Sequence, residues 1–154
     1  MDFCHFTRLG NILLSLPLAL LLATGCTTQQ QSASLVSYAA DPRTMEIEAR
    51  KDDVLRQLAM CESGGDGESS RPIYGGRGAF VGRFQFMPRT VIGFVREMDG
   101  RNLSWNEAVA LAHDYQQAAA LARFAIFERD AISHWPLCNR KLGLRQQVNE
   151  IKSM

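Results

Sequence analysis

Apolar residues recur at helical spacing in several stretches of the chain after residue 40. The first stretch begins at Asp41-Pro42, a typical helix start, and ends at Gly64-Gly65, a typical helix end. Its second half presents one apolar face, made by Val54, Leu55, Leu58 and Ala59. We therefore expect a helix over residues 41–63, although its charged part, 46–53, also suits a separate exposed turn.

Three further helices are predicted between residues 88 and 130. Pro88 suits the first position of a helix that ends at Asp99-Gly100. Ser104 and Glu107 have the spacing of a capping box and start a short helix that runs to residue 112. Asp114 starts a longer helix to about residue 130, and its wide apolar stripe predicts a central position in the fold.

Residues 64–82 contain seven of the twelve glycines in the chain, a density that excludes a helix there. Extended pieces at 72–74 and 79–81 predict a small hairpin within this glycine-rich loop. The fold class is therefore mainly α, a small α+β domain over residues 41–140 with four to five helices. Residues 141–154 are polar and predict a C-terminal tail, either loose or a terminal helix.

Residues 1–25 resemble a lipoprotein signal peptide. Their apolar run is about twelve residues long, too short to span a bilayer core of roughly 30 Å. Small residues before Cys26 resemble a bacterial lipobox, so we expect cleavage before Cys26 and its lipidation; the alternative is an ordinary secretory signal. Residues 26–40 predict a flexible tether. The protein would then be a membrane-anchored lipoprotein facing the cell wall, and Thr27 favours the outer membrane where an organism has one.

Charge and cysteine content limit which partners the protein could bind and bear on whether its cysteines form a disulfide. A formal net charge of +1 gives no electrostatic footprint for nucleic acid. Export would place the two cysteines of the domain, Cys61 and Cys138, where a disulfide forms, so we expect them to be bonded. They lack CxxC spacing, and His113 and His134 are isolated, so we expect no metal and no cofactor.

Glu62 is the candidate for acid catalysis. It lies in the last turn of the first predicted helix and faces the glycine-rich loop. The partial negative charge of a helix C-terminus and burial both raise the pKa of a carboxyl group. A general acid that works near neutral pH needs such a raised pKa.

Two segments, 61–64 (CESG) and 82–90 (GRFQFMPRT), resemble the lysozyme-like domains of lytic transglycosylases and resuscitation-promoting factors. Those domains share a helix ending in Glu-Ser-Gly, a glycine-containing loop and a Gly-x-x-Gln-[Phe/Ile/Leu]-x-x-x-Thr segment. The cysteine before Glu62 and the spacing of Trp135 and Cys138 resemble the resuscitation-promoting factors, whereas Phe-Met-Pro-Arg-Thr resembles the transglycosylases. The resemblance covers about residues 50–140.

The resemblance implies a peptidoglycan lytic transglycosylase with Glu62 as acid and then base. The enzyme would cleave the bond between N-acetylmuramic acid and N-acetylglucosamine and leave a 1,6-anhydro product. A hydrolytic muramidase would instead need a second carboxylate, for which Asp66, Glu68 and Asp99 are candidates. A non-catalytic module that binds glycan or supports the envelope is the alternative from another class.

Five residues are candidates for substrate contacts: Ser63, Tyr74, Gln85, Phe86 and Tyr115. Gln85 both donates and accepts hydrogen bonds, which suits an acetamido or hydroxyl group, and we expect it in the cleft. Tyr74 could stack on a sugar or anchor the loop, and Ser63 could orient Glu62 or cap its helix. Phe86 is more typical of a core. The Ala-Tyr-Asn-Ala-Gly segment of soluble lytic transglycosylases does not occur, so Tyr115 is the candidate to orient the carboxylate.

Overall fold

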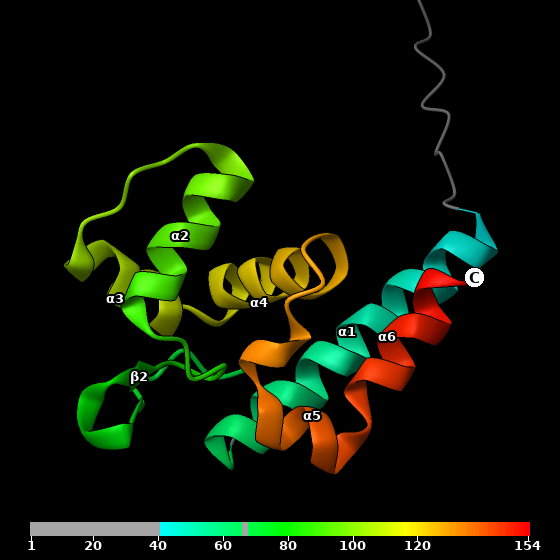
Figure 1. Cartoon of the computed structure of the whole chain (residues 1–154), viewed down its shortest axis with the longest axis horizontal. Helices are drawn as coiled ribbons and strands as arrows, with labels where there is room; N and C mark the ends of the chain where they lie inside the picture. The colour runs from blue at the N-terminus through cyan, green and yellow to red at the C-terminus, as the bar shows by residue number, and fades with distance from the viewer. Residues whose placement is uncertain (1–40, 66–67) are drawn as a thin grey trace, which may run out of the picture. The chain divides into compact units, whose positions relative to one another are not determined.

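The computed structural model describes residues 41–65 and 68–154. The expected signal peptide, Cys26 with its expected lipid, the expected tether and Asp66 lie outside the described residues. The described part is mainly helical, with a two-stranded sheet (Figure 1). Its α-helices are α1 (Pro42–Ser63), α2 (Pro88–Asp99), α3 (Trp105–His113), α4 (Tyr115–Arg123), α5 (Pro136–Leu142) and α6 (Leu144–Lys152).

Helix α1 begins and ends where the sequence predicts. The Asp41 carboxylate accepts a hydrogen bond from the Thr44 backbone N–H at 3.2 Å, and Gly64 ends the helix with φ of 60°. The charged part, 46–53, belongs to the same continuous helix and is not a separate turn. Its charges pair along the helix surface, for example Arg50 with Glu46.

The core gathers side chains from every α-helix. The buried apolar residues include Val54 and Leu58 of α1, Val91 and Val95 of α2, Leu111 and Ala112 of α3, Leu121 and Ala122 of α4, Cys138 of α5, and Leu144 and Val148 of α6. The stripe on α4 is fully buried, which confirms its predicted central position. The chain continues from α4 into a π-helical turn, Phe124–Glu128, in place of the regular helix expected to about residue 130.

The C-terminal segment corrects one expectation. Residues 141–154 are not a loose tail, because α6 packs against α1 and buries Leu144, Val148 and Ile151. Figure 1 shows α6 lying alongside α1, with the C-terminus next to the start of α1. With α6 included, the described residues form six α-helices where four to five were expected, and the domain extends past residue 140.

The glycine-rich loop contains the predicted hairpin. Strands β1 (Tyr74–Gly75) and β2 (Phe80–Val81) pair antiparallel, with Tyr74 opposite Val81, around the short 3-10 turn η1 (Gly76–Gly78). Gly82 follows β2 with φ of +72°, and a Cβ there would lie 1.7 Å from the Ala112 carbonyl oxygen. Only glycine allows the loop to approach the end of α3 so closely.

None of the helices in the described ranges, 41–65 and 68–154, is long and apolar enough to cross a membrane.

Candidate active site

Glu62 lies in a pocket at the C-terminal end of α1. The pocket has a volume of about 280 Å³ and is lined by Glu62, Phe80, Gln85, His134, Trp135, Pro136 and Leu137. Most of these side chains are apolar, and burial among them raises the pKa of the Glu62 carboxyl group. A partly buried carboxyl with a raised pKa is suited to donating a proton to a ligand.

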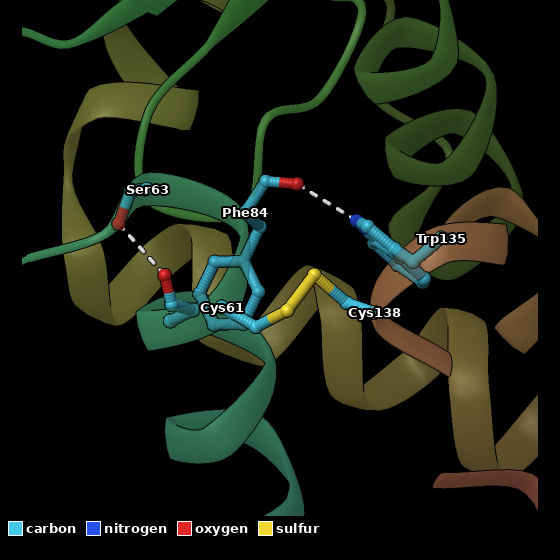
Figure 2. The surroundings of a disulfide bond; sticks show 6 residues. Cys61, Ser63, Phe84, Trp135 and Cys138 are labelled. Atoms are coloured by element: carbon cyan, nitrogen blue, oxygen red, sulfur yellow. Dashed lines mark hydrogen bonds between the residues drawn. A yellow bond between two sulfur atoms is a disulfide. The ribbon is translucent and has the colours of Figure 1, made fainter. Parts of the chain in front are cut away.

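The disulfide joins the end of α1, which carries Glu62, to the segment that contributes residues 134–137 of the pocket. Cys61 is bonded to Cys138 with Cα atoms 5.9 Å apart, which confirms the expected pairing (Figure 2). The buried Trp135 indole N–H donates to the Phe84 carbonyl at 2.7 Å. The end of α1 and the segment 134–138 are therefore joined covalently. We call Glu62 with residues 134–137 the helical wall of the pocket.

Gln85 and Phe80 form the other side of the pocket, which we call the loop wall. Gln85 lies in the pocket as the sequence predicts. Its backbone has a positive φ of 48°, and its side-chain amide donates to the Gly82 carbonyl at 2.7 Å. A Cβ on Gly75 would lie 1.9 Å from Oε1 of Gln85, so the hairpin fixes the amide position by close contact.

A smaller hollow of about 40 Å³ shares part of both walls. It is lined by Phe80, Gln85, Phe86, Met87, Thr90, His134 and Trp135. Phe86 is buried and packs edge-on against Trp135, with ring centroids 5.3 Å apart. Phe86 is therefore a core residue that also lines this hollow.

Ser63 caps the end of its own helix. Its hydroxyl donates to the Ala59 carbonyl at 2.7 Å and accepts from the Arg83 guanidinium at 3.4 Å. Figure 2 shows Ser63 with a dashed line for a hydrogen bond. The single hydroxyl proton is thus used within α1, which favours the capping role over the orientation of Glu62. Arg83 is buried at 1% exposure and also donates to the Ser69 carbonyl.

The two candidate tyrosines do not line the Glu62 pocket. Tyr74 is exposed on β1, and its ring meets His113 edge-on at 4.7 Å between centroids. Tyr115 is buried and stacks on Phe84 at 5.8 Å, and it borders a separate hollow that also includes Glu68. Burial raises the pKa of the Tyr115 phenol. Both tyrosines anchor the loop region.

The described candidates for a second carboxylate also lie elsewhere. Glu68 is exposed and borders the hollow beside Tyr115, and Asp99 ends α2, where the adjacent Arg101 lowers its pKa through a hydrogen bond. Among the described residues that line the pocket, Glu62 is the one carboxylate. Asp66 is outside the described residues.

Sequence reasoning missed five lining residues: Phe80, His134, Trp135, Pro136 and Leu137. A signal existed for the last four, because a Cys61–Cys138 disulfide brings the residues before Cys138 close to Glu62. Phe80 carried no such signal, since its exposed position depends on how the hairpin folds over the pocket.

Comparisons of the chain with protein-family models, with curated proteins and with solved structures each found no match. The described residues contain no group of three or more His, Cys, Asp or Glu side chains that could hold a metal ion.

Proposed function

We propose that the protein is a peptidoglycan lytic transglycosylase in which Glu62 is the general acid and base. The observation that carries the proposal is the position of Glu62: a partly buried carboxyl with a raised pKa, in a mainly apolar pocket that also holds the amide of Gln85. The resemblance of segments 61–64 and 82–90 to lysozyme-like domains supports glycan as the substrate.

The chemistry follows from a single carboxyl group. Protonated Glu62 would donate its proton to the glycosidic oxygen between N-acetylmuramic acid and N-acetylglucosamine, and the bond would break as the leaving sugar takes that proton. The substrate's acetamido group would stabilise the oxocarbenium-like centre. Glu62, now a carboxylate, would accept the proton of the 6-hydroxyl as that oxygen attacks the centre. Substrate assistance of this kind replaces the second carboxylate that most glycosidases use.

The setting of the pocket supports a carbohydrate ligand. Phe80 and Leu137 offer exposed apolar surface for a sugar ring, and Gln85 offers both a donor and an acceptor. The lipid on Cys26 and residues 26–40 would attach the domain to a membrane within reach of the cell wall, with glycan strands as the partner.

The test is digestion of purified peptidoglycan by the oxidised protein, with products separated by mass. We expect anhydro-muropeptides from the wild type. Replacing Glu62→Gln, which keeps the shape but cannot donate the proton, should lower the rate by about 10²–10⁴-fold. Glu97→Gln is the matched control, because it removes an exposed carboxylate of α2 that pairs with Arg129.

Other products would redirect the assignment. Products heavier by one water would support a muramidase, and the variants Glu68→Gln and Asp99→Asn would then identify the second carboxylate. If the folded, oxidised protein gives no products, the proposed enzymatic activity is rejected. Thermal stabilisation by muropeptides would in that case support a glycan-binding module.

A further inference from the structure

His113 ends α3 directly behind the loop wall. Its Nδ1 accepts a hydrogen bond from the Ile73 backbone N–H at 3.4 Å, and the edge-on ring of Tyr74 covers it. A ring whose Nδ1 accepts a hydrogen bond must, while neutral, carry its proton on Nε2. Nε2 is buried and has no hydrogen-bond partner among the described residues.

A chain of hydrogen bonds leads from this ring to the pocket. His113 accepts from the backbone N–H of Ile73, and the carbonyl of the same residue accepts from the Gly82 N–H at 2.9 Å. The Gly82 carbonyl in turn accepts from both the backbone N–H and the side-chain amide of Gln85, at 3.2 and 2.7 Å. These hydrogen bonds link the Gln85 amide to His113 through Ile73 and Gly82.

Protonation of His113 would break the first link. The proton would have to go to Nδ1, because Nε2 already carries one, and an imidazolium has two donors and no acceptor. The Ile73 N–H would then face another N–H. We propose that His113 is a positioning residue that fixes the loop wall, and that it does so only in its neutral form.

The surroundings favour the neutral form near neutral pH. Burial lowers the pKa of His113. Around His113, Tyr74 contacts the ring, Arg71 lies two residues before Ile73, and Asp114 and the buried Tyr115 start α4. The loop also carries Arg83, which donates to the Ser69 carbonyl. Helix α2, which packs against α3, carries Arg89, Arg96, Glu97 and Asp99, of which Glu97 pairs with Arg129 and Asp99 with Arg101. The Asp114 carboxylate accepts from the Gln117 N–H and caps α4. Because the folded-state pKa is lowered, the stability from neutral His113 is complete above the ordinary histidine pKa and is lost as the pH falls through the lowered value.

Amide exchange at Ile73 tests the proposal in the full, oxidised chain. NMR of the ring nitrogens follows His113 as it changes from neutral to protonated. Over the same pH range we expect the protection factor of the Ile73 amide to fall about fivefold to tenfold, because that factor corresponds to the free energy of one hydrogen bond. His113→Asn places a carbonyl acceptor near the position of Nδ1 and cannot titrate, so its protection should persist into acid. His113→Phe keeps the ring contact with Tyr74 but has no acceptor, and protection should be low at every pH.

Two results would overturn the proposal. One is unchanged Ile73 protection when His113 is protonated, and the other is an acid loss in His113→Asn equal to that of the wild type. If His113→Phe fails to fold, the comparison of Ile73 protection in the wild type and in His113→Asn still tests the proposal. His134→Asn is the control for imidazole titration elsewhere, because His134 packs on Phe94 and Trp135. Ile73 should keep its acid sensitivity in that variant.

The consequence for turnover rests on the proposed function. If the protein cleaves peptidoglycan, the wild-type rate should fall on the acid side and the His113→Asn rate should not. If it cleaves nothing at any pH, the proposed function fails, whereas the exchange measurement still confirms or rejects the role of His113.

Discussion

The helical wall and the loop wall of the Glu62 pocket are held by different kinds of interaction. The helical wall rests on the Cys61–Cys138 disulfide and on Trp135, which is buried and hydrogen-bonded to Phe84. The loop wall rests on a two-stranded hairpin, the close contact of Gly82 with α3, and the hydrogen bonds that run from His113 to Gln85.

This difference separates two tasks of a binding pocket. The proton donor must keep one position and one environment, and a covalent bond next to Glu62 secures both. The opposite wall must accept a ligand, and polar contacts worth about 1 kcal/mol each can be remade at small cost.

The largest effect is expected from removing the disulfide that holds the helical wall. The double variant Cys61→Ala/Cys138→Ala releases a loop of 77 residues, and the chain-entropy relation gives a loss of about 4–5 kcal/mol in the free energy of unfolding. Urea denaturation of the oxidised wild type and the variant measures it. An unchanged free energy of unfolding would mean that packing alone holds Glu62 in place.

The second prediction concerns the loop wall. Gly82→Ala adds a Cβ that would lie 1.7 Å from the Ala112 carbonyl oxygen at a φ of +72°, so the loop must shift. We expect a loss of about 2–4 kcal/mol, of which roughly 1–2 kcal/mol is the cost of the left-handed backbone. Gly100→Ala is the matched control, with a φ of +77° and open space around it. Equal losses in the two variants would contradict the close contact with α3.

A smaller effect is expected for Trp135→Phe. The change keeps an aromatic ring in the helical wall but leaves the Phe84 carbonyl without the indole N–H, which costs about 1–3 kcal/mol. Trp105→Phe, at an exposed position on α3, should change the free energy of unfolding by less than about 0.5 kcal/mol. Denaturation curves of both variants provide the comparison, and similar losses would show that the buried hydrogen bond adds nothing.

The smallest effect is the pH dependence of stability at Glu62. Burial raises the folded-state pKa of this carboxyl, so its stabilising contribution is complete below the unfolded pKa and is lost as the pH rises through the raised value. The variant Glu62→Gln cannot ionise. Relative to the wild type it should gain stability between pH 4 and pH 7, measured by urea denaturation at both values. If the difference in the free energy of unfolding between the variant and the wild type is the same at both pH values, Glu62 is solvated like a surface carboxylate.

Local signals in the sequence were sufficient for most elements of the fold. The caps at Asp41 and Ser104 depend on residues within one turn, and the structure shows the predicted bonds, including both halves of the capping box with Glu107. The glycine-rich loop with its hairpin was also predicted. The disulfide followed from cysteine number and the expected compartment, without any knowledge of distance.

The sequence alone therefore determined the first four helices, the loop between the first two, the disulfide and the placing of Glu62 at a helix end, whereas α5 was not predicted. Only the tertiary structure decided that α6 belongs to the core, because three apolar residues in a polar stretch become informative once α1 is there to cover them. It also decided that Tyr115 lies outside the pocket and that His134 and Leu137 line it. Which side chains share a cavity depends on how helices pack across long sequence separations, and periodicity within one helix does not contain that information.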